Sequence, residues 1–283
     1  MPDFLAPIEL GQTGLRVSRL GIGSSFTGDP RMIEEAVAEG VNYLYWGSIR
    51  RPAFGRAIRT LASRDRDGLV VTVQSYSRVA ALLAPSVEIA LRRTGLERFD
   101  FLLLGMWNRP PGRALVEAAL RLVERGRVGH LMLSTHNRPS LRDHFRDFER
   151  GASPYAAFML RYNAVHRGAE RDAFPYLPET ARPGLITYTA TRWGHLCDPA
   201  KMPPGEPVPP TRDCYRFALS HPAVQMVLCA PRSRDEMQEA LRARAAGPLT
   251  PEEMERMHRI GDHIYGRYRP QFAEKGDAAI GLR

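Results

Sequence analysis

Lysine is scarce in this sequence of 283 residues, although the chain is basic. Its formal net charge is +9, and the 40 lysine and arginine residues include only two lysines, Lys201 and Lys275. Nucleic-acid-binding proteins usually concentrate basic residues on one face or in one run, whereas the arginines here are spread along the whole chain. We therefore predict a generally basic surface and no nucleic-acid partner.

Long apolar stretches and paired cysteines are missing as well. No run of about 18 apolar residues occurs, so we expect no transmembrane helix and no membrane partner. The first residues lack the basic and apolar regions of a secretory signal, which makes a cytoplasmic protein the simplest expectation. The cysteines, Cys197, Cys214 and Cys229, have no C-x-x-C spacing and predict free thiols in a reducing compartment.

Short motifs for metals and for nucleotide phosphates are also lacking. His195 and Cys197 lie close together in the sequence, but no established ligand set completes them, and we expect no metal. Glycine-rich phosphate loops of the nucleotide-binding kinds do not occur. The function therefore has to be inferred from the pattern of strands and helices.

Strand and helix patterns alternate along most of the chain, after a hairpin signal around Thr13 and Gly14. Strands are predicted at 20–23, 42–45, 69–75, 99–104, 129–134, 156–162, 185–189 and 224–228. Helices are predicted at 31–39, 52–63, 85–94, 113–125, 139–148, 170–180, 212–220 and 234–245. Eight such units predict a parallel (β/α)8 barrel, with a doubly wound open sheet as the alternative. We expect one domain over 1–283: a barrel at 10–245, an added helix at 250–268, and a loosely ordered tail at 269–283.

Aromatic and polar residues follow the predicted strands. In a parallel barrel these carboxyl ends form the functional face. The candidates for binding a substrate there are Trp46, Arg50, Tyr76, Trp107, Asn108, Arg161, Asn163, Arg192 and Trp193. All 3 tryptophans of the chain fall at these ends, which favours a lined pocket over ordinary polar loops.

Several motifs, taken in order and spacing, resemble the aldo-keto reductase superfamily. The opening LGQTGLRVSRLGIGS is similar to the family's first hairpin, GVNYLYWG to G-[IV]-N-F-x-D-T-A, and TGLERFDFLLLG to L-G-x-D-Y-x-D-L-Y-L-L-H. ITYTATRWGHL and CAPRSRDEMQEAL are similar to its seventh and eighth strand regions. The resemblance implies a (β/α)8 TIM barrel of aldo-keto reductase type, with an N-terminal β-hairpin and an extra C-terminal helix. It also implies reduction of carbonyls with NADPH.

The resemblance locates four catalytic positions, and none of them holds the residue that the family uses. In the family a tyrosine donates a proton, aided by a lysine that an aspartate holds, while a histidine orients the substrate oxygen. The aspartate position matches Tyr45, and the tyrosine falls near Arg50. The lysine and histidine positions match Ser75 and Gly105. Because neither lysine of the chain is near the third strand, the acid-lysine pair is absent in any alignment.

The cofactor positions of the family are kept in part. Ser134, Tyr188, Arg232 and Ser233 match its polar, stacking and phosphate-contacting positions, and a helix starting near Ser233 would offer backbone amides to an anion. The departures are Thr135, Met159, Ala230 and Ala240. The resemblance therefore leaves NADP(H) as a possible cofactor.

Replacement chemistry could come from two histidines at neighbouring strand ends. His136 and His166 are candidate proton shuttles near neutral pH, with Tyr45 as a donor or as an aromatic wall. Arginines at the mouth could grip a carboxylate or phosphate, or could instead pair with nearby carboxylates.

Three functional hypotheses follow for a chain that binds a small-molecule substrate or ligand. The first is a divergent enzyme that acts on a small polar or anionic compound, including aromatic ones, by non-redox acid-base chemistry. The second is an NADPH-dependent oxidoreductase with a replaced proton donor. The third is a non-catalytic pseudoenzyme that binds a ligand or partner, because a fold alone does not guarantee chemistry.

Overall fold

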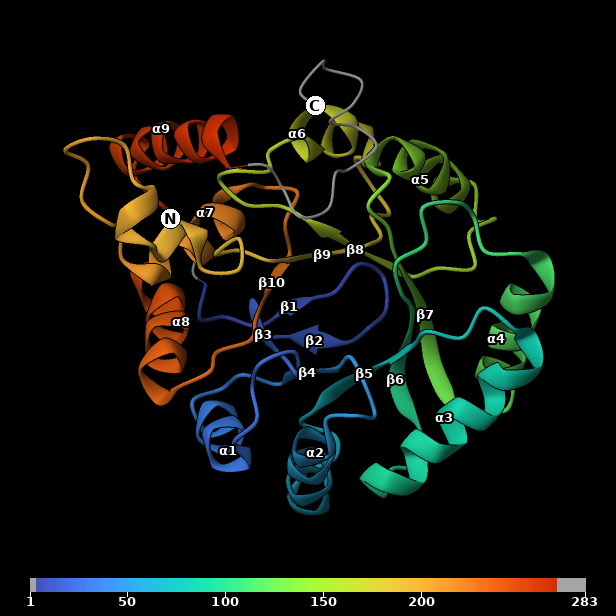
Figure 1. The fold of residues 1–283 in the computed structure, drawn as a ribbon. Helices are drawn as coiled ribbons and strands as arrows, with labels where there is room; N and C mark the ends of the chain where they lie inside the picture. The colour runs from blue at the N-terminus through green and yellow to red at the C-terminus, as the bar shows by residue number, and fades with distance from the viewer. Residues whose placement is uncertain (1–3, 269–283) are drawn as a thin grey trace.

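A closed parallel barrel organises the structure, a computed structural model that describes residues 4–268. Its strands are β3 (Leu20–Gly23), β4 (Tyr43–Trp46), β5 (Val70–Ser75), β6 (Phe99–Leu104), β7 (Val128–Ser134), β8 (Ala157–Arg161), β9 (Gly184–Tyr188) and β10 (Met226–Cys229). They pair in chain order, and β10 closes the barrel on β3 (Figure 1). The predicted barrel is thus confirmed, and the open sheet is excluded.

A short hairpin precedes the barrel, as predicted. It pairs β1 (Ile8–Glu9) with β2 (Arg16–Val17) and lies across the middle of the barrel in Figure 1. Leu10 and Val17 are fully buried in the cluster that fills the barrel interior. At Gly11 the backbone approaches Gly184 so closely that an added Cβ would lie 2.3 Å from its nitrogen, and φ is +60°. The hairpin therefore plugs the barrel at the end where β9 begins.

Helices surround the barrel (Figure 1). They are α1 (Pro30–Ala38), α2 (Pro52–Arg64), α3 (Ala80–Thr94), α4 (Arg113–Glu124), α5 (Leu141–Glu149), α6 (Ala169–Asp172), α7 (Thr211–Ser220), α8 (Arg234–Ala246) and α9 (Pro251–Arg267). Among the described residues, 4–268, no helix is long and apolar enough to cross a membrane.

Two predicted helices differ from the structure. The third helix begins at Ala80 and not at Pro85, so Pro85 lies in its second turn, where it removes one backbone hydrogen bond. The predicted helix at 170–180 is wrong for most of its length. It ends at Asp172 and continues as a 3-10 turn, Phe174–Tyr176, since Pro175 and Pro178 cannot donate to a helix.

Strand β4 shows how the barrel sorts its side chains. Tyr43 and Tyr45 belong to the interior cluster, whereas Leu44 and Trp46 are buried between the barrel and its helices. This alternation follows from the two-residue period of a strand. Trp46 packs on Gly55 of α2, where an added Cβ would lie 2.8 Å from its ring, so it does not face the barrel mouth.

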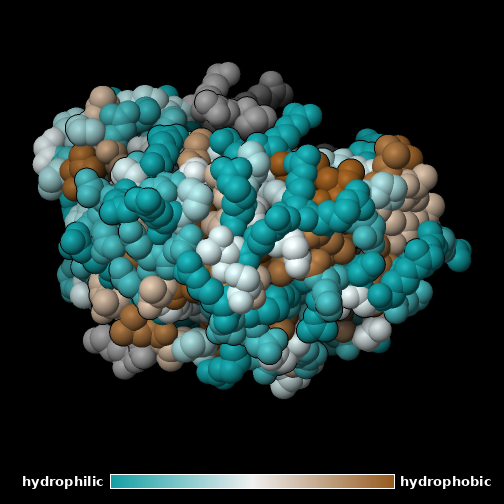
Figure 2. Space-filling view, turned by 90° about the horizontal axis from the view of Figure 1, so that it is seen from below, coloured by the Kyte–Doolittle hydropathy of each residue, from teal (hydrophilic) through white to brown (hydrophobic). Residues whose placement is uncertain are grey.

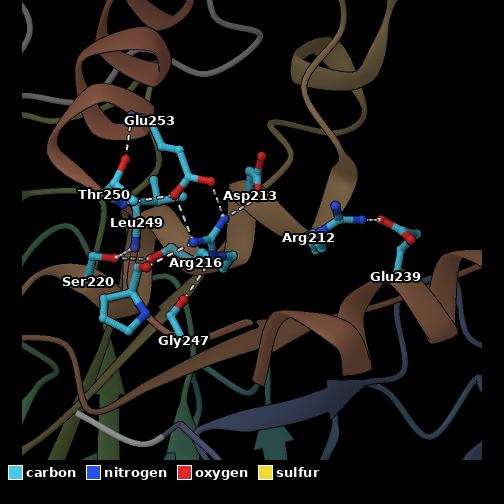
Figure 3. A network of polar contacts seen from close by, with 10 residues as sticks. Arg212, Asp213, Arg216, Ser220, Glu239, Gly247, Leu249, Thr250 and Glu253 are labelled. Atoms are coloured by element: carbon cyan, nitrogen blue, oxygen red, sulfur yellow. Dashed lines mark hydrogen bonds and ion pairs between the residues drawn. The ribbon is translucent and has the colours of Figure 1, made fainter. Parts of the chain in front are cut away.

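The C-terminal helix is held by a buried arginine of α7 (Figure 3). The side chain of Arg216 is 7% exposed and lies 2.8 Å from carboxylate oxygens of both Asp213 and Glu253. It also donates to the carbonyl oxygens of Gly247 and Pro248. Glu253 completes a capping box with Thr250 at the start of α9, as the TPEE sequence predicts for a helix start. The expected tail at 269–283 lies outside the described residues.

Candidate active site

One cavity of about 360 Å³ lies at the carboxyl ends of the strands. It runs from Tyr45 on β4 and Gln74 on β5, past His136 and Tyr188, to the loop that follows β10. In a parallel barrel this end carries the active site. The cavity therefore joins the strand ends where the catalytic positions were predicted to the loop where a cofactor was predicted.

The deepest polar contact in this cavity links Tyr45 to Gln74. The Tyr45 hydroxyl donates to Oε1 of Gln74, and both side chains line the cavity. Gly105 adjoins this pair, because a Cβ at that residue would overlap the Gln74 amide. The absence of a side chain at residue 105 thus makes room for the Gln74 amide.

The contact between Tyr45 and Gln74 distinguishes Gln74 from Ser75, the residue matched to the family's lysine position. Gln74 faces the cavity together with Tyr45. The Ser75 hydroxyl lies 3.4 Å from that of Ser86 on α3 and accepts from the backbone of Ser77, so it faces the helices. A neutral hydrogen-bonded pair thus lies at these strand ends.

His136 is held at the cavity wall by the neighbouring loop after β6. Its backbone N–H donates to Oδ1 of Asn108 at 3.0 Å, and Nδ2 of Asn137 donates to the Asn108 carbonyl. Its Nδ1 lies 3.4 Å from the Tyr188 hydroxyl, and the two rings meet edge to face. Asn108 therefore positions the histidine loop and does not line the cavity itself.

The inner end of the cavity is uncharged near neutral pH. Burial, followed by the nearby Arg161, lowers the pKa of His136 below its usual value of 6.5. Burial raises the pKa of Tyr45 well above its usual value and that of Tyr188 to about 12. The imidazole is therefore mainly neutral at pH 7, and both phenols keep their protons.

The predicted site residues separate into two groups. Those that line the cavity are Tyr45, Tyr76, Ser134, His136, Tyr188, Trp193 and Arg232. Those that lie outside its lining are Trp46, Arg50, Trp107, Asn108, Arg161, Asn163, His166, Arg192 and Ser233. The structure brings together most of the aromatic candidates and separates them from most of the arginines.

His166 lies in a packed cationic region outside the cavity lining. Its ring is 2% exposed, and its Nε2 accepts a hydrogen bond of 3.3 Å from Nε of Arg192. Burial, followed by the neighbouring Arg161 and Arg192, lowers the pKa of His166 to about 2. The neutral imidazole serves as an acceptor for Arg192, whose Nη2 also donates to the Tyr268 carbonyl at 2.7 Å.

Asn163 and Trp107 also contact residues of the surrounding loops and do not line the cavity. The Asn163 amide donates to the carbonyl of Thr189 and accepts from the backbone of Val165 and His166, so it joins the loops after β8 and β9. The guanidinium of Arg78 stacks over the Trp107 ring at 3.9 Å. These residues support the loops at the mouth.

The loop after β9 turns sharply, so that adjacent residues face opposite ways. Thr189, Arg192 and Trp193 have φ of +60°, +50° and +54°, a region that residues other than glycine seldom occupy. Trp193 lines the cavity, whereas Arg192 is 1% exposed and bonds His166. The strained turn thus separates an aromatic wall from a buried charge.

Arg50 lies in a second groove, on the outside of the barrel between α2 and α3. It lines this groove with Arg56, Arg59, Arg92 and Arg93. Figure 2 shows the molecule from below the view of Figure 1, where hydrophilic side chains cover most of the surface. Arg50 and Arg51 directly precede α2, whereas Arg161 and Arg192 are buried outside the cavity lining. The predicted grip of these four arginines on one anion is therefore not assembled.

A nicotinamide cofactor fits the cavity in its inner half. Ser134 and Tyr188 line it there, offering a hydroxyl and an aromatic face. At its mouth the guanidinium of Arg232 stacks over Phe26 at 4.4 Å. The start of α8 is less suited to a phosphate than predicted, because Ser233 Oγ accepts from the Glu236 N–H and the Glu236 carboxylate accepts from the Arg232 N–H. Of the residues here, Arg232 would hold a phosphate.

The residues that sequence reasoning missed are Gln74 and Cys197, both of which line the cavity. Gln74 had a signal, since it is a long polar residue within the buried run VVTVQS. Cys197 had none, because it enters the cavity through a short turn after β9. Within residues 4–268 no three His, Cys, Asp or Glu side chains are grouped as a metal site requires.

No model of a known protein family matches the chain. Solved structures nevertheless match nearly all of it. The holo form of aldo-keto reductase AKR11C1 from Bacillus halodurans is 19% identical, with a TM-score of 0.76 over 94% of this chain and 99% of that one. An aldo-keto reductase from Klebsiella pneumoniae in complex with NADPH is 18% identical, with a TM-score of 0.75 over 93% and 96%. This chain thus has the aldo-keto reductase fold that its motifs predict.

Proposed function

We propose that this protein is an NADP(H)-dependent oxidoreductase of small uncharged carbonyl compounds or alcohols, with His136 moving the proton. The observation that carries the proposal is the single cavity that joins Tyr45, Gln74 and His136 to the loop bearing Arg232. The fold likeness to a reductase solved with NADPH supports the same cofactor. Ser134 and Tyr188 would contact the nicotinamide end, and Arg232 the phosphate end. When bound, the cofactor would supply or accept the hydride.

His136 is the residue of choice for the proton. It is the histidine among the described cavity residues, and imidazole titrates nearest to neutral pH. Its lowered pKa makes it a base at pH 7, which suits removal of a proton from an alcohol. Carbonyl reduction needs the protonated form and is therefore favoured at lower pH. Tyr45 instead donates to Gln74 and would orient the substrate oxygen.

The substrate class follows from the walls of the cavity. Its inner part is lined by Tyr45, Tyr76, Met159 and Trp193, and the charged groups, Arg232 and Glu236, belong to the loop and helix that follow β10. Arg161 lies near enough to lower the pKa of His136 but does not line the cavity, so a carboxylate or phosphate would lose its water there without direct contact with a cation. An aromatic or aliphatic aldehyde, ketone or alcohol meets no such penalty. The proposal therefore favours an uncharged substrate over an anionic one.

Non-redox acid-base chemistry remains the second candidate. It is favoured by one observation, the neutral contact between Tyr45 and Gln74 where the family has a charged pair. His136 would then act as a general base on the ligand without a cofactor. The two candidates share a cavity and differ in whether NADP(H) binds.

Cofactor titration separates these candidates. We expect NADPH fluorescence to change on binding, and Arg232→Gln to weaken NADPH about ten-fold while affecting NADH less, since a charged hydrogen bond to the 2′-phosphate is lost. Arg234→Gln is the matched control, because Arg234 pairs with Glu35 and does not line the cavity. Absence of NADPH binding at millimolar concentration would contradict the proposal.

Turnover is then measured on a panel of neutral aldehydes, ketones and alcohols with NADPH or NADP⁺, followed by cofactor absorbance. Oxidation or reduction of any of them supports the oxidoreductase. Cofactor-independent conversion in the same panel, read by mass spectrometry, would favour the acid-base enzyme. A ligand that binds and is recovered unchanged with every cofactor would favour a binding protein.

A further inference from the structure

Two free cysteines meet at the wall of the cavity. Cys197, half-buried in the turn His195–Cys197, lines the cavity, and Cys214 is 1% exposed on α7. The turn packs on α7, and the two thiols lie close enough that each changes the pKa of the other. Thr211, one turn before Cys214, also lines the cavity and donates from its hydroxyl to Sγ of Cys197 at 3.5 Å. One sulfur thus faces the cavity with a second sulfur directly behind it.

The two thiols differ in acidity because of this contact. The proximity of Cys214, and then the hydrogen bond from Thr211, lower the pKa of Cys197. The same contact, together with burial, raises the pKa of Cys214 well above its usual value. Cys197 therefore carries the thiolate, which is the reactive form of cysteine, and Cys214 keeps its proton.

A third cysteine provides an internal comparison. Cys229 lines the same cavity but is 1% exposed, and burial raises its pKa to about 12. Unlike that of Cys197, its pKa is set by burial and not by a neighbouring thiol. The cavity thus holds one activated and one inert cysteine, so access to the cavity alone does not account for a difference in their reactivity.

We propose that Cys197 is an oxidation site of this cavity and that Cys214 converts the oxidised sulfur to a Cys197–Cys214 disulfide. The oxidant is a hydroperoxide. The Cys197 thiolate attacks its terminal oxygen, the O–O bond breaks, and the alcohol or water leaves with a proton, which gives a sulfenic acid. The Cys214 sulfur then attacks the Cys197 sulfur, and the sulfenic hydroxyl leaves as water with the Cys214 proton.

This modification changes the cavity and does not depend on the proposed cofactor. The disulfide draws Cys197 away from the cavity lining toward α7, because an S–S bond of about 2.05 Å is shorter than any contact between free thiols. A sulfenic acid or an alkyl group on Cys197 instead projects into the cavity. Either product alters the wall next to Thr211 and Trp193, and with it the binding of cavity ligands.

The test uses the full chain treated with hydrogen peroxide without cofactor, followed by intact-mass and peptide mass spectrometry. We expect a loss of two hydrogens and a peptide pair that joins Cys197 to Cys214, both reversed by dithiothreitol. Cys229→Ser is the matched control and should form the same disulfide. Cys214→Ser should stop at a sulfenic acid that dimedone traps on Cys197, and Cys197→Ser should give neither product.

Alkylation provides a second readout that needs no disulfide. Iodoacetamide at pH 7 should modify Cys197 at least about ten-fold faster than Cys229, as their thiolate fractions require. Equal rates at the two residues, or peroxide products on Cys229 in place of Cys197, would overturn the proposal. Protection of Cys197 by NADPH would be an added result of the proposed function, and its absence would leave the disulfide test intact.

Discussion

The inner end of the cavity and the packed layer behind the loops after β8 and β9 differ in the charges that they bury. Tyr45 and Gln74 meet in the cavity as neutral groups. Behind those loops, Arg138, Arg161 and Arg192 are each at most 1% exposed, which places them among the largest fully buried side chains. The molecule therefore buries these guanidinium groups outside the lining of the cavity, and of the three Arg161 lies near enough to lower the pKa of His136.

The difference reflects what each region has to satisfy. A buried charge needs partners, and Arg138 lies 3.1 Å from the Asp172 carboxylate, while Arg192 bonds His166 and the Tyr268 carbonyl. Such contacts tie loops together and leave these groups occupied. The cavity walls carry hydroxyl, amide, imidazole and aromatic groups. These neutral groups can give up their bound water when a neutral ligand enters. The buried charged groups thus stabilise the fold, and the neutral polar groups of the cavity are the ones available for catalysis.

The largest effect is expected on the neutral side of this comparison, at His136. His136→Gln should lower turnover by about 10² to 10⁴-fold with little change in thermal stability, because the proton carrier is lost. In the wild type, the rate of reduction should fall and the rate of oxidation should rise as the pH increases through the pKa of His136, which lies below 6.5. Rates at several pH values on a substrate from the panel measure both.

His263→Gln, on α9 and away from the cavity lining, is the control and should retain turnover. A pH profile that His136→Gln leaves unchanged would remove His136 from the proton transfer. The proton transfer would then have to be assigned to Tyr45 or Tyr76.

The charged side is tested at Arg216, whose network Figure 3 shows. Arg216→Met should lower the free energy of unfolding by about 3 kcal/mol, since Asp213 is left buried without its partner. Arg212→Met, which breaks the more exposed contact with Glu239, should cost less than about 1 kcal/mol. Urea unfolding of both variants measures the two losses in free energy of unfolding. Equal losses would contradict the structural role of buried charge.

The same network predicts an acid dependence. The hydrogen bond from Arg216 lowers the pKa of Glu253 below its usual 4.5. A carboxyl with a lowered folded-state pKa stabilises at neutral pH, and this contribution is lost as pH falls through that folded-state pKa. The wild type should therefore lose more stability than Arg216→Met between neutral pH and pH values below 4.5.

The smallest effect is expected at Gly105, and it tests whether the Gln74 side chain lies beside this residue. Gly105→Ala should destabilise by about 1–3 kcal/mol, because the added methyl group overlaps the Gln74 amide. Combining it with Gln74→Ala should recover part of that loss, which a double-mutant cycle measures. Additive effects of the two substitutions would mean that residues 74 and 105 do not meet in the cavity.

Local patterns in the chain were sufficient for the order and type of most elements. Strands 20–23 and 99–104 were predicted at their observed bounds, since alternation and turn residues act within a few positions. The absence of lysine from β5 also follows from the sequence, because the chain has only Lys201 and Lys275.

Tertiary structure decided which of these residues meet. Whether Gln74 or Ser75 faces the axis depends on the phase of β5 relative to the closed barrel, and a shift of one residue exchanges the two faces. The burial of Arg161, Arg192 and His166 depends on packing between loops that follow different strands. The meeting of Cys197 with Cys214 requires a turn and a helix to dock. Sequence periodicity describes one element at a time, whereas a cavity is made by the closure of all of them.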